Sequence, residues 1–594
     1  MEKYKNCFHN MQKIITRNLP LLFILILAAL LRLWGIQFGL PQMQIGDEGA
    51  LIAAALYSGA NWLKPFRPMY GQFVPYFLLI EYGVYFVLGK IFGIFKSPFD
   101  VLISFIKDPR ELLLIGRFTM AMFGVATVWL VYYMGRQFYN KRIGLLAAIF
   151  LSFAFLHTKE SHYLKESNPA AFFTLACFYF TVQIFTRGAK LDYFLAGVFL
   201  GLGLGAKYEP ILMIVVLIIA HLLRHKKIIF KNVKYLLLGI IPIIFLTFPY
   251  LFFNPLQYWQ MFLAEYKLTT TVYSLYLQGK PVWWWFLFVH IPQGLGNLLF
   301  ATAILGFFVS LVNGRFKREY LFLPVLPVIF LLTIDYWQKF HNARYALLIL
   351  PYLTLAGAVS VDWFARFITS KYRQSIFVTV VVISLVAPSV VRTVKFNTVT
   401  LKPDTRQLSK KWIETNIPAG SRVLVESMVR PEYPANINTP LFLDKESIQR
   451  YLIEARASGY PGFFLTALKT AVQGKIGYDL VDTARVDVTY DRSTRVPALL
   501  TSAQYWVNQN VTYLIITSWH TQPEPTPEFQ KSITETYDLI KEFQPNPQFQ
   551  SDPHFVQMDY SALDRVNIFS HELIFGPVIQ IYKIKDKAAS KYKF

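Results

Sequence analysis

Long apolar runs alternate with short polar loops over about the first two thirds of this 594-residue chain. A helix needs about 20 apolar residues to cross a hydrocarbon core roughly 30 Å thick. By this measure the runs predict eleven membrane-spanning helices, at approximately residues 19–39, 112–135, 143–158, 169–186, 191–207, 209–223, 235–252, 286–312, 320–335, 344–365 and 374–394. A further apolar stretch at 72–93 either lies along the outer surface or forms a hairpin with the run at 101–106. The pattern therefore predicts eleven or thirteen spans.

The lysines and arginines of the loops give these helices an orientation, because such residues concentrate on the cytoplasmic side of a membrane. Every second loop is basic, and these loops together hold 20 basic residues. This predicts a cytoplasmic N-terminus and an extracytoplasmic region after the last span. The basic residues 1–18 precede a run without a convincing cleavage site, which favours a retained signal anchor. The predicted location is the cell (inner or plasma) membrane, crossed many times.

Residues 395–594 have the pattern of a separate soluble domain. They hold 23 basic and 21 acidic residues, whereas residues 1–394 hold 36 and 15. The pattern predicts helices at 405–416 and 527–543 and strands at 422–426, 511–518 and 576–584. The sequence therefore predicts a transmembrane domain over 1–394 and a small extracytoplasmic α/β domain over 395–594. Whether this domain recognises the acceptor or covers the site stays open.

The composition excludes an ordinary soluble enzyme. Hydrophobic residues make up 54% of the chain and charged residues only 16%, with a mean hydropathy of +0.37, whereas about 25% charged residues are usual in soluble domains. The net charge of +23 could indicate nucleic acid, but the charge lies between apolar runs and not on a polar surface. We therefore expect no nucleic-acid partner. Cys7 and Cys177 indicate no disulfide framework.

The outer loops contain most of the acidic residues of the membrane part, eleven of 15. The first of these loops holds Asp47 and Glu48, directly after the first predicted span. Adjacent carboxylates at a membrane boundary can supply a general base, and repulsion between them raises the pKa of one. The alternative is a solvated turn in which the aspartate caps a helix.

The next outer loop, at 157–169, contains two histidines, two lysines and two glutamates within ten residues. Interfacial anchoring explains Lys159 and Tyr163 but not the whole group. No compact metal-ligand pattern is present, so no cofactor is assigned with certainty. A divalent cation is the one cofactor that this loop leaves open.

Two further outer segments carry cations suited to a phosphate. Lys207 follows the small-residue run GLGLGA, and Arg344 precedes Tyr345 at the start of a span. An ammonium can pair with phosphate, and a guanidinium can bind it through two hydrogen bonds. Snorkelling at the interface is the alternative for either cation alone. The glycine run follows no strand, which excludes a nucleotide-binding loop. The aromatic loop at 253–285 suits an interfacial belt, a lipid tail or a sugar face.

The motifs GDEGALIAAAL, SHYLKESNPAAFF, GLGLGAKY and FHNARYALLILPYLTLAGA resemble those of the polyprenyl-phosphate-sugar-dependent glycosyltransferases of the GT-C superfamily. The similarity is greatest to the protein O-mannosyltransferases and to the aminoarabinose transferases that modify lipid A. It covers roughly residues 15–365 and is specific in the first and last motifs.

The resemblance implies an inverting transfer of a hexose or pentose. The donor is a polyprenyl-phosphate sugar in the bilayer, and a hydroxyl of a protein, lipid or glycan attacks it at the extracytoplasmic face. By likeness, Asp47 is the general base and Glu48 orients acceptor or donor. Family members often have an aspartate where this chain has Asn168, so either Glu166 substitutes for it or this second acid is dispensable. The implied substrate-binding residues are His162, Lys165, Lys207, Tyr208, His341, Arg344 and Tyr345, of which Lys207, Arg344 and Tyr345 hold the phosphate.

Two rival functions stay open at this point. A secondary transporter predicts repeat-related halves and ionisable residues near the midplane. The chain shows no obvious internal repeat, and its polar clusters lie at outer helix ends. The other rival is a non-catalytic protein that binds a sugar lipid on the same scaffold.

Overall fold

The computed structural model describes residues 2–41, 46–226, 230–271, 279–314, 318–337, 342–402, 404–425, 456, 462–471, 477–482, 503–518, 527–545, 574 and 578–586. The chain forms two compact units. Unit 1 comprises Met1–Ile36, Tyr57–Leu79 and Gly116–Asn397, and unit 2 comprises Gln37–Leu56, Ile80–Ile115 and Thr398–Phe594. The predicted domain boundary near Lys395 stays a prediction.

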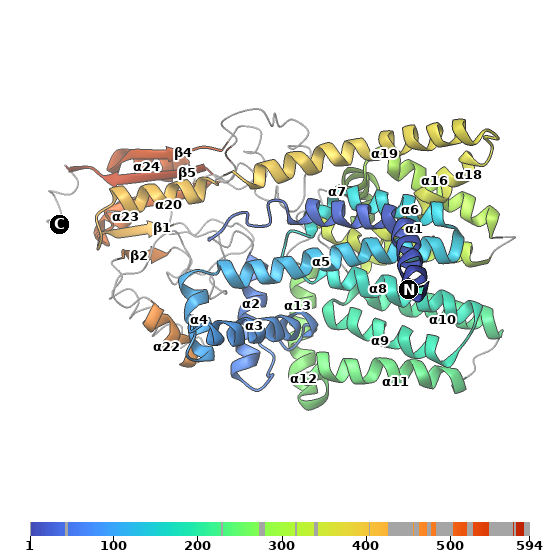
Figure 1. Ribbon diagram of the computed structural model, residues 1–594. Coiled ribbons are helices and arrows are strands. Elements are labelled where there is room, and N and C mark those ends of the chain that lie inside the picture. The colour runs from blue at the N-terminus through green and yellow to red at the C-terminus, as the bar shows by residue number, and fades with distance from the viewer. Residues whose placement is uncertain are drawn as a thin grey trace. The chain divides into compact units, whose positions relative to one another are not determined.

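Unit 1 is helical (Figure 1). Its described helices are α1 (Glu2–Leu33), α6 (Lys141–Phe153), α7 (Phe155–Glu160), α8 (Ser167–Thr186), α9 (Lys190–Ala206), α10 (Met213–His225), α11 (Phe230–Thr247), α12 (Pro249–Phe253), α13 (Pro255–Thr271), α14 (Val282–Trp285), α15 (Ile291–Leu295), α16 (Asn297–Asn313), α17 (Val325–Trp337) and α18 (Leu350–Ala365). The helices α2 (Gly46–Ala60), α3 (Phe73–Ile91), α5 (Arg110–Met134) and α19 (Lys371–Thr400) contain residues of both units.

Within the described residues, five helices are long and apolar enough to cross a membrane: Phe73–Ile91, Arg110–Tyr139, Ser167–Thr186, Arg318–Tyr336 and Lys371–Thr400. A sixth is added if Val282–Leu295 and Asn297–Asn313, which meet at a bend of 115°, form one broken span. The other predicted spans coincide with shorter helices or, for 19–39, with Asn18–Leu33, the apolar part of α1, and 143–158 is interrupted between α6 and α7 at Ala154. The prediction of a polytopic helical membrane protein is confirmed.

The stretch at 72–93 forms α3, which is one of the five candidate spans. The short apolar run after it forms a separate helix, α4 (Pro98–Lys107), whose first turn is closed by Asp100. The Asp100 carboxylate accepts hydrogen bonds from the backbone N–H groups of Lys96 and Ser97. The surface and hairpin interpretations of this stretch, and the number of crossings, stay predictions.

Glycines let α9 and α11 approach each other closely, as small residues do between membrane helices. A Cβ atom added at Gly201 would lie 2.8 Å from the Cβ of Ile243. Gly71, just before α3, lies directly against the backbone of Gly205, so a Cβ there would overlap the Gly205 carbonyl group. The run GLGLGA before Lys207 is therefore explained by helix packing, as the sequence predicts.

A Gly71→Ala variant is expected to lower the free energy of unfolding by about 1–3 kcal/mol, because overpacking forces the backbone to move. The displaced segment would be that of Gly205, two residues before Lys207. We expect a lower melting temperature in detergent. The matched control is Gly83→Ala, since a Cβ at Gly83 would meet no atom within 4 Å. Equal melting temperatures for the two variants would contradict the close approach.

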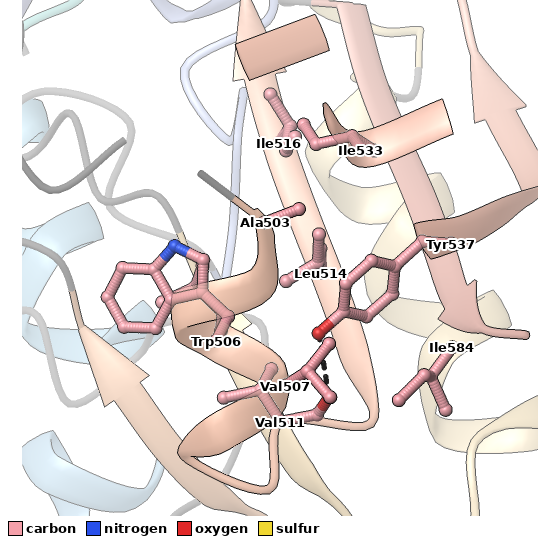
Figure 2. Packing of buried hydrophobic residues seen from close by; sticks show 10 residues of the cluster. Ala503, Trp506, Val507, Val511, Leu514, Ile516, Ile533, Tyr537 and Ile584 are labelled. Carbon is pink, nitrogen blue, oxygen red and sulfur yellow. Dashed lines mark hydrogen bonds between the residues drawn. The ribbon is translucent and has the colours of Figure 1, made fainter. Parts of the chain in front are cut away.

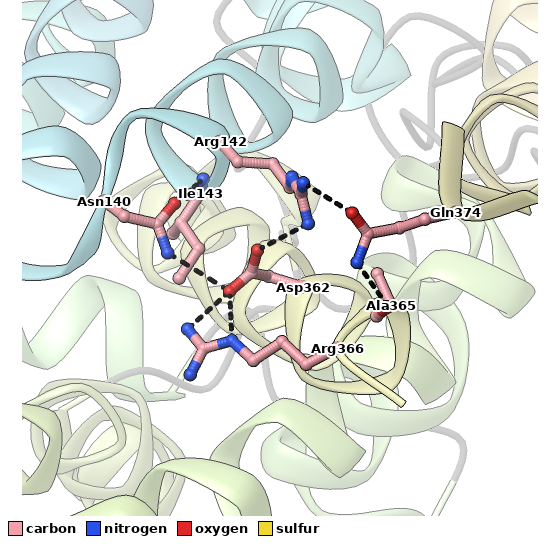
Figure 3. A network of polar contacts seen from close by, with 7 residues as sticks. All are labelled: Asn140, Arg142, Ile143, Asp362, Ala365, Arg366 and Gln374. Carbon is pink, nitrogen blue, oxygen red and sulfur yellow. Dashed lines mark hydrogen bonds and ion pairs between the residues drawn. The ribbon is translucent and has the colours of Figure 1, made fainter. Parts of the chain in front are cut away.

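A polar network joins three helices at the end of unit 1 where α6 begins and α18 ends (Figure 3). Asp362 is buried and accepts hydrogen bonds from Asn140 at 3.1 Å and from Nη2 of Arg366 at 2.6 Å. Arg142 lies 3.4 Å from the same carboxylate and donates to Gln374 of α19 at 2.9 Å. These residues belong to the basic loops predicted to be cytoplasmic, so the structure places two of those loops at one end of the unit.

Unit 2 contains a five-stranded mixed sheet with the order β2-β1-β3-β5-β4. Its strands are β1 (Arg422–Val425), β2 (Asp479–Asp482), β3 (Tyr513–Ser518), β4 (Tyr537–Phe543) and β5 (Val578–Ile584). β1 pairs in parallel with β2 and β3, with Leu424 opposite Leu514, while β5 is antiparallel to β3 and β4. The remaining described helices of this unit are α20 (Thr405–Asn416), α22 (Gly462–Ala471), α23 (Ala503–Asn508) and α24 (Pro527–Thr536).

Alternate residues of the sheet enter two separate hydrophobic cores, because successive strand side chains point to opposite faces. One core contains Leu514 and Ile516 and is closed by Trp506 of α23 and Ile533 of α24 (Figure 2). The Tyr537 hydroxyl donates a hydrogen bond to the backbone carbonyl of Val511 at 2.9 Å within this core. The other core joins Tyr513 and Ile515 to Ile413 of α20. The predicted α/β character of the C-terminal region is confirmed.

One predicted element is wrong in its second half. The segment 527–543, expected as one helix, forms α24 only to Thr536 and then continues as β4. β4 is an edge strand with a register shift between Leu539 and Lys541, and its exposed side chains include charged ones, so it lacks the alternation of an ordinary strand. Pairing with β5, which is distant in sequence, decides its conformation.

Candidate functional site

Lys207 lies at the end of α9, where the helix stops at Ala206. Its backbone N–H still donates to the Gly203 carbonyl at 2.8 Å, which fixes the direction in which the side chain leaves the helix. The ammonium lies 2.7 Å from Oε1 of Glu209 and 4.1 Å from the ring centroid of Tyr345. A cation over an aromatic face and beside a carboxylate is held in one place.

Arg344 reaches the same location from the first turn before α18. The helical turn Ala343–Leu348 is capped by Asn342, whose Oδ1 accepts a hydrogen bond from the Arg344 N–H at 3.1 Å. The Arg344 guanidinium carbon lies 5.8 Å from the Tyr345 ring centroid. Lys207 interacts electrostatically with Arg344 and with Glu166, which precedes α8. Two cations and two carboxylates from three segments of unit 1 therefore converge.

Aromatic side chains line the neighbourhood of Lys207. The ring centroid of Tyr208 lies 5.5 Å from that of Phe262 and 6.4 Å from that of Tyr70. The Tyr70 hydroxyl donates to Glu265 at 2.6 Å. Burial raises the pKa of Tyr70, and the hydrogen bond to Glu265 raises it further, so this phenol stays neutral and acts as a donor. A half-buried aromatic surface of this kind suits a lipid tail or the face of a sugar ring.

The loop at 157–169 is buried, although its charges suggested an exposed position. His162 lies with one ring nitrogen 2.9 Å from the Thr158 carbonyl and the other 2.9 Å from the Trp34 carbonyl. Burial lowers the pKa of His162. Lys165 is 3% exposed and lies 5.9 Å from the ring centroid of Tyr163. These contacts join the loop to the end of α1, and substrate binding by His162 and Lys165 stays a prediction.

Arg32 of α1 is a buried residue that the sequence analysis did not single out. Its guanidinium is fully buried and donates to the carbonyls of Leu151 and Ser152 at 3.2 and 3.3 Å. It also lies 2.9 Å from Nδ1 of His157. Arg32 thus caps the end of α6 where the chain breaks before α7. In the sequence, the signal that could have identified Arg32 is its position as a basic residue inside an apolar run.

A Glu160→Gln variant is expected to lower the free energy of unfolding by about 3 kcal/mol, because loss of one partner leaves a buried charge uncompensated. Lys159 and Glu160 form an ion pair at 3.1 Å, with side chains 0% and 3% exposed. Thermal unfolding in detergent measures the effect. The control is Asp108→Asn, whose ion pair with Arg110 is exposed and is expected to matter by less than about 1 kcal/mol. Equal losses in the two variants would show that the buried pair is not stabilising.

Asp47 and Glu48 occupy the first turn of α2, where carboxylates interact favourably with the helix dipole. Glu48 is fully buried and Asp47 is partly exposed. Both belong to unit 2, whereas Glu166, Lys207 and Arg344 belong to unit 1. The alternative of a solvated turn does not fit Glu48, which is fully buried inside α2, and the catalytic roles of Asp47 and Glu48 stay predictions.

His341 lies outside the described residues. Among the residues that the structure describes, no group of three or more His, Cys, Asp or Glu side chains is arranged to hold a metal ion. Sequence analysis did not select Glu209, Glu265 or Tyr70. The acidic character of the outer loops was the signal for the two glutamates.

Comparisons with known proteins agree with the motifs. Residues 113–253 match the family model described as Dolichyl-phosphate-mannose-protein mannosyltransferase. No curated protein matches the chain in a sequence search.

Among solved structures, the chain is similar to ArnT from Cupriavidus metallidurans bound to undecaprenyl phosphate, with 12% identity, a TM-score of 0.47 and coverage of 88% of this chain and 96% of that one. It is also similar to the Archaeoglobus fulgidus oligosaccharyltransferase tethered with an acceptor peptide, with 12% identity, a TM-score of 0.46 and coverage of 85% and 69%. The S. cerevisiae Pmt1-Pmt2 complex bound to the sugar donor matches with 19% identity, a TM-score of 0.30 and coverage of 41% and 34%. The family match over residues 113–253 agrees with the resemblance seen in the motifs: this part of the chain is similar to the protein O-mannosyltransferases, which belong to the GT-C superfamily.

Proposed function

We propose that the chain transfers a sugar from a polyprenyl-phosphate donor to a hydroxyl of a protein, lipid or glycan at the extracytoplasmic face. The observation that supports this most is the convergence of Lys207, Arg344 and Tyr345 at one end of unit 1. Two cations beside a phenol suit a phosphate, because charge-assisted hydrogen bonds to an anion are strong. The surrounding aromatic residues suit the lipid and the sugar.

In the proposed reaction, Asp47 takes the proton of the acceptor hydroxyl as its oxygen attacks the anomeric carbon. The bond between that carbon and the phosphate oxygen breaks, and the lipid phosphate leaves with the electron pair. Lys207 and Arg344 stabilise the negative charge that develops on this phosphate. Glu48 orients acceptor or donor, and Glu166 supplies a second carboxylate near Lys207.

The proposal includes an orientation. The N-terminus lies in the cytoplasm, the transmembrane domain covers 1–394, and the α/β domain over 395–594 lies outside the cell (inner or plasma) membrane. The alternation of basic loops supports this, since 20 basic residues occupy every second loop. The transferred group is a hexose or a pentose, and the role of a divalent cation is to be tested by adding a chelator.

Reconstitution tests the proposal. The purified chain is placed in nanodiscs with a panel of polyprenyl-phosphate sugars and hydroxyl acceptors, and product formation is followed by mass spectrometry. We expect transfer from at least one donor of the panel. Transport of a solute by reconstituted vesicles, with no transfer from any donor, would favour the secondary transporter. Donor binding without transfer would favour the non-catalytic sugar-lipid-binding protein.

A further inference from the structure

Glu209 is a carboxylate in a place where phosphate binding alone would not require one. It follows Lys207 by two positions, and its side chain is 8% exposed. One oxygen, Oε1, lies 2.7 Å from the Lys207 ammonium. The other, Oε2, is buried and has no hydrogen-bond partner among the described residues. A buried acceptor without a partner costs about 1–3 kcal/mol or more when charged, so a ligand that supplies a donor would be bound favourably.

A site built only of cations would bind a lipid phosphate with or without its sugar. A carboxylate beside Lys207 repels the phosphate and partly neutralises the ammonium, so it weakens that interaction. This cost is recovered only by a ligand that carries a hydrogen-bond donor next to its phosphate. A sugar bonded to the phosphate has hydroxyl or amino groups in that position, and a carboxylate accepts hydrogen bonds from both.

We infer that Glu209 recognises the sugar of the donor, its Oε2 accepting a hydrogen bond from a hydroxyl or amino group adjacent to the phosphate that Lys207 binds. This inference rests on the proposed function. Glu209 is then a specificity-determining residue. It favours the sugar-bearing diester, which has one negative charge, over the lipid phosphate product, which has a free phosphate and more negative charge.

The experiment compares two affinities in nanodiscs, one for the sugar donor that the wild type uses and one for polyprenyl phosphate without sugar. In Glu209→Gln, the amide oxygen turns towards the Lys207 ammonium, so an N–H group replaces the accepting Oε2. We expect the preference for the donor over polyprenyl phosphate to fall about tenfold, which corresponds to about 1.4 kcal/mol. The affinity for polyprenyl phosphate should stay equal or increase, because a repelling charge is removed.

Monodeoxy or deamino analogues of the donor sugar identify the contact. One analogue should bind the wild type about tenfold more weakly than the full donor, while Glu209→Gln should bind both equally. Glu209→Asp keeps the charge but shortens the side chain, so we expect an intermediate preference. Binding of polyprenyl phosphate by each variant shows that its site is folded.

The matched control is Asp108→Asn, because Asp108 is another carboxylate but forms an exposed ion pair with Arg110. A preference that stays within twofold of wild type in Glu209→Gln, or that falls equally in Asp108→Asn, would overturn the inference. The two proposals fail differently. If the wild type neither binds nor transfers any sugar donor, both fail, whereas transfer with an unchanged preference refutes the role of Glu209 alone.

Discussion

An Asp47→Asn variant is expected to bind the sugar donor normally and to transfer its sugar about 100- to 10,000-fold more slowly, the range that a general base contributes. The amide is nearly isosteric with the carboxylate, but it cannot accept the proton of the acceptor hydroxyl. The loss should therefore appear in kcat and not in the affinity for the donor. Single-turnover transfer in nanodiscs, together with donor binding, separates the two quantities.

Two matched variants keep this result interpretable. Asp108→Asn removes an exposed carboxylate from the same unit and is expected to transfer at the wild-type rate. Glu48→Gln changes the neighbouring, fully buried carboxylate and is expected to affect the affinity for acceptor or donor. Wild-type transfer by Asp47→Asn would remove this residue as the base and would leave the carboxylates of unit 1 as the alternatives.

A Lys207→Met variant should bind polyprenyl phosphate about 10- to 100-fold more weakly, because a hydrogen bond between charged groups contributes about 1.5–3 kcal/mol. Methionine keeps the volume of the aliphatic chain while removing the ammonium that lies 4.1 Å from the Tyr345 ring centroid. Transfer should also slow, since in the proposed reaction the same cation stabilises the leaving phosphate. Binding in nanodiscs at several salt concentrations measures the effect.

The control for this variant is Lys280→Met. Lys280 also belongs to a predicted outer loop and lies over an aromatic ring, 5.1 Å from the centroid of Trp284, but it is exposed. We expect wild-type affinity for polyprenyl phosphate in this control. If Lys280→Met and Lys207→Met bound equally well, the cluster around Lys207 would not be the phosphate site, and interfacial snorkelling would explain both lysines.

Local patterns predicted much of the fold. The helix predicted at 405–416 is α20 with the same bounds, because its capping residue, Asp404, and its apolar face both lie within a few turns. The strands β1, β3 and β5 fall within the predicted segments for the same reason. The prediction of one helix over 527–543 is wrong, because the second half of this segment is exposed and charged and becomes a strand only by pairing with β5.

Part of the candidate site could likewise be predicted from the sequence and part could not. Each residue type was readable from the sequence: a lysine after a glycine run, an arginine before a tyrosine, and a pair of carboxylates after the first span. The residues that contact them in the folded chain could not be read from the sequence. That Glu209 accepts from Lys207, and that Tyr345 lies under the ammonium, depends on how α9 and the turn before α18 pack together.

The sequence by itself determined that the chain is a membrane protein of many helices with a soluble α/β region, and its motifs indicated a glycosyltransferase. These features follow from apolar length, charge distribution and residue type, which are local properties. Only the tertiary structure decided that the charged loop at 157–169 is buried and that two cations and two carboxylates converge. The reason is physical: burial and charge pairing depend on contacts between segments far apart in the chain, such as that of Gly71 with Gly205, which no local pattern specifies.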